Sequence, residues 1–457
     1  MGGRKPLPVA LTIAGSDSGG GAGIQADLKT FAVMGVHGTS AITSITAQNT
    51  REVRAIHDLP PEMVVAQIEA VADDLGVDAA KTGMLSNAGI IEAVAKTIDR
   101  YGFPLVVDPV MVAKSGARLL REDAVEAMRR LMVPRATVVT PNAPEAEVLT
   151  GIKIRGRRDQ EEAARIIVEE LGAEAAVVKG GHLGGGESVD VLYYRGRVEA
   201  IRAPRVYRNT THGTGCAFSA AIAAGLAKGR SIPEAVRVAK EFITMAIDYG
   251  LELGGGVGPV NPVAWLEVPA ERWRVLSNLE DALRVLLERE EAAVKLMPEV
   301  QMNIAMALPA IYARTPLDVA AFPGRIGVSN GRLVVKAKPE FGASRHMARL
   351  VLAAMKHDPR VRAAMNVRYD EALVEAAESL GLVVAEFSRE EEPPEVRERE
   401  GATLPWALEQ AVREHGRVPD VIYDKGGHGK EPMIRILAGS AVEVVRKALR
   451  IAEKAGY

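Results

Sequence analysis

The chain has 457 residues, of which 47% are hydrophobic and 25% are charged. This composition is typical of a soluble globular protein, and the length predicts more than one domain. The net charge of −2 argues against nucleic-acid and membrane partners, and a single cysteine excludes an internal disulfide framework and a Cys-rich metal site. The sequence has no apolar run of about 18 residues and no signal-peptide pattern, so we expect a cytoplasmic protein.

The first half of the chain alternates short apolar runs with helical patterns. Residues 8–15 predict a buried strand, which is followed by a Gly-rich loop over 16–23 and a helix over 24–34. A second helix is predicted over 62–74. Further strands are predicted at 40–47, 79–83, 105–107, 138–140 and 175–178. This order indicates an α/β domain with a mostly parallel sheet flanked by helices.

Polar residues follow several of these strands directly. Asp108 follows one strand, Asn142 and Glu145 follow the next, and Lys179 follows a third. In open parallel sheets, ligands bind at the carboxyl ends of the strands, so we expect these side chains to share one edge. Each of them alone could be a helix cap or a surface residue. Their repetition at successive strand ends favours a common site.

The stretch 211–217 adds a loop suited to an anion. Gly213 and Gly215 flank Thr214, and the Ala-rich run that follows predicts a helix. Glycines let backbone N–H groups face a ligand, and a helix N-terminus adds unpaired donors and partial positive charge. Cys216 lies at the helix start, which we expect to lower its pKa and favour the thiolate. A glycine-bounded turn with a small buried cysteine is the alternative.

Together these residues suit phosphoryl transfer from ATP. Asp108, Asn142 and Glu145 could supply oxygens to Mg²⁺, directly or through water. Lys179 could neutralise phosphate charge, and Gly213, Thr214 and Gly215 could hold the transferred phosphoryl group.

Five motifs in order resemble the hydroxymethylpyrimidine/phosphomethylpyrimidine kinases, which belong to the ribokinase-like superfamily. They are Ala14–Asp27 (AGSDSGGGAGIQAD), Thr46–Asn49 (TAQN), Lys81–Met84 (KTGM), Asp108–Met111 (DPVM) and His212–Cys216 (HGTGC), and the resemblance extends to Pro262. It implies two phosphorylations of hydroxymethylpyrimidine with ATP and Mg²⁺. It also implies that Gln48 pairs with the pyrimidine edge and that Gly15, Ala22, Met84 and Val110 wall the pocket. Cys216 stands where sugar kinases carry a general-base Asp.

The alternation stops after Pro262. Residues 265–274 read as a connector, which places the boundary between domains 1–267 and 268–457. A helix over 278–296 is predicted next. Later strands are predicted at 303–308, 332–336, 363–368, 382–387 and 420–423, and helices at 344–356, 371–380, 404–414 and 441–453. This order indicates a second α/β domain.

Basic residues in the second half lie among glycines or at a helix start. Arg325 lies between Gly324 and Gly327, and Arg345 and His346 begin a helix. Lys425, His428 and Lys430 crowd into a Gly-rich loop after a strand. Each is by itself most simply a solvated charge, whereas the three clusters together favour a phosphorylated ligand.

These stretches resemble the thiamine-phosphate synthase domain that is fused to the pyrimidine kinase mainly in archaea. The matching motifs are Phe322–Gly327 (FPGRIG), Phe341–Met347 (FGASRHM) and Asp424–Pro432 (DKGGHGKEP). The resemblance implies that the pyrimidine diphosphate joins a thiazole phosphate and releases pyrophosphate. Arg325 and His346 would act most directly, with Arg345, Lys425, His428 and Lys430 binding phosphate. We also expect a homo-oligomer.

Two alternatives remain open on the sequence alone. Domains similar to the second half serve as ligand sensors in transcription regulators, so the second domain could bind a thiamine precursor without turnover. The first half could instead be a sugar or pyridoxal kinase. Cys216 and the Gln48 motif argue against a sugar, whereas overlap with pyridoxal stays open.

Overall fold

The computed structural model describes residues 6–112, 119–120, 122–181, 183–427 and 429–457. The chain forms two compact units, Met1–Leu266 and Glu267–Tyr457, so the division falls inside helix α9 (Ala264–Glu288). Each unit is treated separately below. Within the described residues, no helix combines the length and apolar character needed to cross a bilayer.

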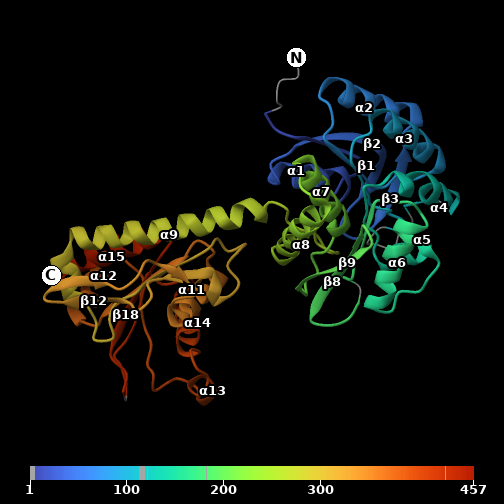
Figure 1. Cartoon of the computed structure of the whole chain (residues 1–457). Helices are drawn as coiled ribbons and strands as arrows, with labels where there is room; N and C mark the ends of the chain where they lie inside the picture. The colour runs from blue at the N-terminus through green and yellow to red at the C-terminus, as the bar shows by residue number, and fades with distance from the viewer. Residues whose placement is uncertain (1–5, 113–118, 121, 182, 428) are drawn as a thin grey trace. The chain divides into compact units, whose positions relative to one another are not determined.

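A sheet of nine strands forms the centre of the first unit among the described residues (Figure 1). Its spatial order is β3-β2-β1-β4-β5-β6-β7-β8-β9. The six strands β2, β1, β4, β5, β6 and β7 pair in parallel, whereas β3 is antiparallel to β2, β8 to β7 and β9 to β8. This confirms the mostly parallel α/β prediction. The strands are β1 (Val9–Asp17), β2 (His37–Gln48), β3 (Val53–Asp58), β4 (Ala79–Thr82), β5 (Leu105–Val107), β6 (Val138–Val139), β7 (Ala175–Val178), β8 (Glu187–Tyr194) and β9 (Arg197–Pro204).

Helices cover both faces of this sheet. Side chains alternate along each strand, so Leu105 and Val107 pack into one core while Val106 packs into the other. The Val106 face carries α1 (Gly23–Val33), α7 (Thr214–Ala227) and α8 (Ile232–Asp248). The other face carries α2 (Pro61–Asp74), α3 (Ala88–Tyr101), α4 (Glu122–Ala127), the short helices η1 (Met128–Met132) and η2 (Val133–Arg135), α5 (Ala143–Thr150) and α6 (Arg157–Glu169).

Most of α9 belongs to the second unit, and residues 265–274, predicted as a connector, form the first turns of this helix. Val268, Val275, Leu279 and Ala282 are all buried, and their spacing of three, four and seven residues places them along one side of the helix. Pro269 lies inside α9 beyond its first turn, so the carbonyl of Trp265 lacks the backbone N–H donor that another residue at 269 would supply. The predicted helix over 278–296 is divided between α9 and α10 (Glu290–Lys295).

The main sheet of the second unit is mostly antiparallel. Its order is β14-β11-β10-β15-β18-β17-β16, and only β16 and β17 pair in parallel among the described strands. A separate hairpin joins β12 to β13. The strands are β10 (Ile304–Ala307), β11 (Val319–Ala321), β12 (Ile326–Ser329), β13 (Arg332–Val335), β14 (Glu340–Phe341), β15 (Ala363–Arg368), β16 (Val384–Glu386), β17 (Val421–Asp424) and β18 (Met433–Ala438).

Helices complete the second unit. A core cluster joins α11 and α14 to the sheet, and α15 packs on β15 and β18. The helices are η3 (Pro316–Asp318), α11 (Arg345–His357), α12 (Glu371–Ser379), α13 (Pro394–Arg397), α14 (Thr403–His415) and α15 (Ala441–Lys454). A second domain of helices and strands is confirmed. Because its sheet is mostly antiparallel, the rule that ligands gather at parallel strand ends does not apply to it.

Candidate active site

A cavity of about 740 Å³ in the first unit brings the predicted kinase residues together. Residues from the β1–α1 loop, the ends of several strands and the start of α7 line it. The predicted residues among its lining are Gly15, Ala22, Gln48, Met84, Asp108, Val110, Asn142, Glu145, Lys179, Gly213, Thr214, Gly215 and Cys216. Positions far apart in the sequence therefore border one space, as expected from the strand ends.

Gly213 lets two loops of this site approach backbone to backbone. It caps α7 in the left-handed region with φ 81°. A β-carbon at this position would lie 1.8 Å from the carbonyl oxygen of Gly21 in the β1–α1 loop. Only glycine fits here, so the glycine holds the N-terminus of α7 against that loop at the cavity.

Asp108 and Lys179 form a charge pair beside the α7 loop. Asp108 is 1% exposed, and its Oδ1 lies 3.2 Å from Lys179 Nζ. A β-carbon on Gly215 would lie 3.4 Å from Asp108 Oδ2 and 3.6 Å from Lys179 Nζ, so both charged groups border the glycine loop. Ser219 Oγ also donates to Asp108 Oδ2 at 3.3 Å. An anion at the loop would therefore meet one cation and one carboxylate.

Asn142 and Glu145 form a capping box at the start of α5. The Asn142 side chain accepts from Glu145 N at 2.9 Å, and Glu145 Oε2 accepts from Asn142 N at 2.8 Å. Burial raises the pKa of Glu145 to about 7, against the opposing charge of Lys179. Among the described residues, no group of three or more His, Cys, Asp or Glu side chains is placed to hold a metal. The Asn142 and Glu145 side chains therefore cap α5, whereas the Asp108 carboxylate accepts from Lys179, Thr140 and Ser219.

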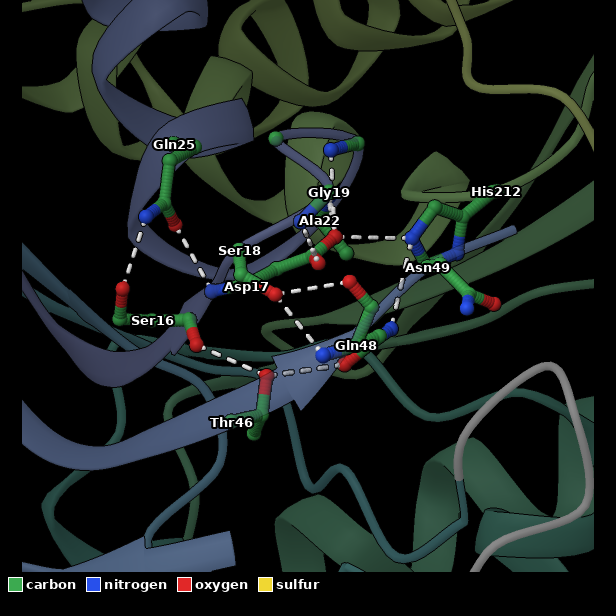
Figure 2. Close-up of polar contacts among 12 residues, drawn as sticks. Ser16, Asp17, Ser18, Gly19, Ala22, Gln25, Thr46, Gln48, Asn49 and His212 are labelled. Carbon is green, nitrogen blue, oxygen red and sulfur yellow. Dashed lines mark hydrogen bonds and ion pairs between the residues drawn. The ribbon is translucent and has the colours of Figure 1, made fainter. Parts of the chain in front are cut away.

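A buried network around Asp17 and His212 was missed in the sequence (Figure 2). Asp17 Oδ2 lies 2.9 Å from His212 Nε2, and the Asp17 carboxylate accepts from the backbone N–H groups of Gly19, Gly21 and Ala22. Burial opposes the charge on Asp17, but these hydrogen bonds outweigh it and lower its pKa. Both residues lie inside motifs quoted above, and that was the only signal for them.

Gln48 extends this network towards the cavity. Its Nε2 lies 3.5 Å from His212 Nε2, and its Oε1 accepts from Thr46 Oγ1 at 3.2 Å (Figure 2). Since Asp17 only accepts, His212 Nε2 must donate to it, and the same nitrogen cannot accept from Gln48. Turning the amide so that its oxygen faces the imidazole resolves this conflict. The Gln48 amide thus lies at the cavity wall beside two polar side chains, Thr46 and His212.

Cys216 is in place, but the expected low pKa is wrong. The residue is the third of α7 and lines the cavity, and its thiol accepts from Gly23 N–H. Burial raises its pKa to about 11, and the charge of Lys81 opposes this only in part. Packing around the sulfur therefore outweighs the field of the helix N-terminus.

In the second unit, the Arg325 turn and the loop after β17 are linked by hydrogen bonds. Arg325 has a positive φ of 63°, and its guanidinium donates to Val300 O. Val300 N in turn donates to Glu431 Oε2 at 3.0 Å. Two of the sequence motifs, at 322–327 and 424–432, are therefore held side by side.

Two arginines that were not predicted converge on a buried carboxylate next to that loop. Asp424 is 0% exposed, and it pairs with Arg389 Nε at 2.7 Å and with Arg435 Nη1 at 2.7 Å. A β-carbon on Gly427 would lie 3.4 Å from Arg389 Cδ, so Arg389 lies directly beneath the glycine loop. Arg435 comes from β18, a strand without a quoted motif, so no sequence signal pointed to it.

His346 lies within the field of this cluster. Partial burial and the charges of Arg435, Arg389, Arg325 and Lys430 lower its pKa to about 4. Burial of the imidazole is the larger cause, and the four cations add to it. His346 is therefore neutral at pH 7, with one nitrogen free to donate and the other to accept.

The remaining predicted synthase residues differ in their surroundings. Arg345 is exposed at the start of α11, and Lys430 is exposed at the Gly427 turn. Lys425 Nζ lies 3.1 Å from Glu386 Oε1, so its charge is paired with that carboxylate. His428 lies outside the described residues. A cavity of about 640 Å³ in this unit is lined by other residues, including Arg360, Asp420 and Arg450, and by none of the predicted ones.

Comparisons with known proteins cover both halves of the chain. The family of phosphomethylpyrimidine kinases matches residues 17–261, and the thiamine-phosphate synthase ThiN family matches residues 278–450. The bifunctional thiamine biosynthesis protein ThiDN of Methanocaldococcus jannaschii is 33% identical over 447 residues, covering 96% of this chain and 97% of that protein.

The first half has further relatives. The hydroxymethylpyrimidine/phosphomethylpyrimidine kinase of Streptomyces coelicolor is 50% identical over 254 residues, or 56% of this chain and 94% of that protein. A solved pyridoxal kinase from Staphylococcus aureus, in complex with AMP-PCP and pyridoxal, is 37% identical with a TM-score of 0.54, covering 57% of this chain and 96% of that one. With the matches to both family models and to a full-length bifunctional relative, the chain belongs to the bifunctional thiamine-biosynthesis proteins, with a phosphomethylpyrimidine kinase domain followed by a thiamine-phosphate synthase domain.

Proposed function

We propose that the cavity of the first unit phosphorylates hydroxymethylpyrimidine and its monophosphate with ATP, and that the Arg325–His346 cluster of the second unit joins the product to thiazole phosphate. The observation that supports the first part is that one cavity is lined by the Gln48 amide, by apolar side chains, by the Gly213–Gly215 loop and by Lys179. The basic cluster around His346 carries the second part.

The pyrimidine would lie against Gln48. A side-chain amide donates and accepts at once, which suits a ring nitrogen next to an exocyclic amino group. Gly15, Ala22, Met84 and Val110 would provide the walls, and the Sδ of Met84 would lie 3.1 Å from a β-carbon on Gly15. Any side chain at Gly15 would thus press on Met84 in the space assigned to the ring.

The phosphates of ATP would lie at the α7 loop. Backbone N–H groups of Gly213, Thr214 and Gly215 and the ammonium of Lys179 would offset the charge that builds on the transferred phosphoryl group. Mg²⁺ fits this end through Asp108, because the ion is commonly held by one or two carboxylates together with substrate phosphates. Asn142 and Glu145 would act through water. Bound there, Mg²⁺ would supply further neutralisation of phosphate charge.

Cys216 would take the hydroxyl proton of the pyrimidine. As the hydroxyl oxygen bonds to the γ-phosphorus, the bond from phosphorus to the bridging oxygen breaks, ADP leaves, and the proton moves to the Cys216 sulfur. The raised pKa of Cys216 means that the thiolate is a minor form at pH 7. In the loose transition state of phosphoryl transfer, proton removal contributes less than positioning and charge stabilisation.

In the second unit the thiazole nitrogen would attack the methylene carbon of the pyrimidine diphosphate, and the bond from that carbon to the pyrophosphate oxygen would break. Arg325, Arg389, Arg435 and Lys430 would stabilise the departing pyrophosphate. Neutral His346 would donate a hydrogen bond to the leaving oxygen. Arg345, which is exposed, and Lys425, which pairs with Glu386, would contribute only at the margin of the site.

The direct test supplies the full chain with hydroxymethylpyrimidine, thiazole phosphate and Mg-ATP. Thiamine phosphate, pyrophosphate and two ADP per product are the expected yield. If pyrimidine diphosphate accumulates while the second unit binds thiamine phosphate without forming it, the sensor alternative replaces the synthase role. If no ADP forms above the ATPase background, the kinase role fails.

Pyridoxal is a second candidate substrate for the first unit, because solved pyridoxal kinases at 37–43% identity share its fold. Competition between pyridoxal and hydroxymethylpyrimidine in the ADP-release assay would measure the overlap. A homo-oligomer and a cytoplasmic location also stay predictions, which light scattering and cell fractionation would test.

A further inference from the structure

Beneath the kinase cavity lies a buried ion pair that has no role in the reaction described so far. Lys81 Nζ on β4 lies 2.9 Å from Asp27 Oδ2 on α1, and both side chains are 0% exposed. Thr12 Oγ1 donates to the same Asp27 oxygen at 2.7 Å. The other oxygen, Oδ1, has no hydrogen-bond partner among the described residues.

Stability does not explain this arrangement. Removing two charges from water costs free energy, and their attraction offsets it only when the remaining oxygens and protons are also satisfied. Here one carboxylate oxygen is buried without a partner. Replacing such pairs with apolar side chains is often neutral or stabilising, so a functional reason for burying Lys81 and Asp27 is the better explanation.

The pair lies close to the reacting thiol. Lys81 and Cys216 line the same cavity, and α7, which carries Cys216, packs on both β4 and α1. Gly23 N–H bonds to the thiol, and Asp27 lies one turn further along the same helix. A β-carbon on Gly83 would lie 2.9 Å from Lys81 Nζ, so glycine leaves room for the ammonium at the cavity floor.

The two charges act on the sulfur in opposite directions. The positive charge of Lys81 favours the thiolate of Cys216, and the carboxylates of Asp27 and Asp108 disfavour it. Burial opposes the charge on Lys81 itself, but Asp27 outweighs this and raises the pKa of Lys81. The lysine is therefore a permanent cation, and because its side chain is fully buried, water screens its charge little.

We propose that Lys81, held in place by Asp27, is a positioning residue that stabilises the negative charge on the Cys216 sulfur before that sulfur takes the substrate proton. This deepens the proposed kinase function and rests on it for the role of Cys216. The proton moves from the substrate hydroxyl to Cys216, while Lys81 keeps its own proton throughout.

Because Cys216 is the only cysteine, its titration can be followed directly in the full-length protein. The neutral reagent iodoacetamide alkylates the thiolate, and the midpoint of the rate against pH reports the thiol pKa independently of access. Lys81→Met should raise the midpoint by about one unit, a tenfold drop in thiolate at a given pH. Asp27→Asn should lower it by a similar amount. The double variant, which buries no charge, should fall between them.

The opposite signs separate this proposal from a structural role. If both single variants shift the midpoint in the same direction, or neither moves it, the proposal is wrong. If Lys81→Met fails to fold, Asp27→Asn and the double variant still test the proposal. The alkylation midpoint of the double variant must then lie at a higher pH than that of Asp27→Asn. Alkylation needs neither pyrimidine nor ATP, so its outcome is independent of the proposed function. In an active enzyme, the alkaline shift in Lys81→Met should also appear in the pH profile of kinase turnover.

Discussion

The two units of this chain assemble their candidate sites by different means. In the first unit, parallel strands deliver Asp108 and Lys179 to one edge of the sheet, where they meet the glycine loop before α7. In the second unit, the sheet is mostly antiparallel, and loops bring Arg325, Arg389 and Lys430 around the neutral His346. A site at parallel strand ends can be anticipated from strand order, whereas a site built from loops depends on tertiary contacts.

The difference extends to how charge is held. Asp108 lies at a cavity wall and pairs with a single cation, Lys179, so its negative charge is offset by only one positive charge. Asp424 is instead fully buried and bridges two arginines, which leaves cationic charge in excess. The first arrangement suits a magnesium-bound triphosphate and the second a free pyrophosphate.

The largest expected effect concerns the buried bridge of the second unit. Asp424→Asn leaves Arg435, which is 3% exposed, without its counter-charge, and removing one partner of a buried pair costs about 3–5 kcal/mol. Thermal unfolding should show an early transition from this unit. The matched control is Glu386→Gln at the exposed Lys425 pair, where about 0–1 kcal/mol is expected. Equal losses of stability in both variants would show that the buried Asp424 pair does not stabilise the second unit more than an exposed pair does.

The next largest effect is expected for Asp108→Asn, which should lower the kinase activity and leave the synthase activity unchanged. Without the carboxylate beside the α7 loop, turnover should fall by about 10²–10³-fold, comparable with the loss of a transition-state stabilising group. Ser219→Ala, which removes only a hydroxyl bound to the same carboxylate, serves as the control and should stay close to wild type. ADP release with saturating hydroxymethylpyrimidine measures both. A small loss in Asp108→Asn would remove it from the magnesium site.

Gln48→Ala should weaken pyrimidine binding more than ATP binding. Leaving ligand polar groups unpaired costs about 1–3 kcal/mol, and calorimetry would read this as a weaker Kd for hydroxymethylpyrimidine. Ser18→Ala is the control, because Ser18 bonds the Gln48 backbone and not its amide. Unchanged pyrimidine affinity in Gln48→Ala would assign the amide to the Asp17–His212 network alone.

The smallest expected effect is a pH dependence of the free energy of unfolding of the second unit. The pKa of His346 is lowered to about 4 in the folded state, so between pH 6.5 and 4 the unfolded chain binds more protons than the folded one. The free energy of unfolding should therefore be fully present above pH 6.5 and decline as the pH falls towards 4. His346→Asn should flatten this decline. An unchanged slope in that variant would mean that His346 titrates normally.

The sequence predicted more of the first unit than of the second. Every kinase residue proposed from strand ends and motifs lines the one cavity, because parallel strands fix where their carboxyl ends lie. In the second unit Arg389 and Arg435 were missed, since only folding brings β18 and the segment after β16 to Asp424. Pro269 concealed the start of α9, and the raised pKa of Cys216 reflects packing that no spacing reveals.

If one chain carries two separate active sites, two variants of the full-length protein should separate their activities. Cys216→Ala should lose about 10²–10⁴-fold in pyrimidine phosphorylation, the usual cost of a missing general base, yet make thiamine phosphate at the wild-type rate from supplied pyrimidine diphosphate. Arg325→Ala should phosphorylate normally and accumulate the diphosphate. Measuring both activities in both variants gives the decision. We predict that Cys216→Ala loses only the kinase activity and that Arg325→Ala loses only the synthase activity. Loss of both activities in either variant, with an unchanged melting temperature, would contradict two separate sites.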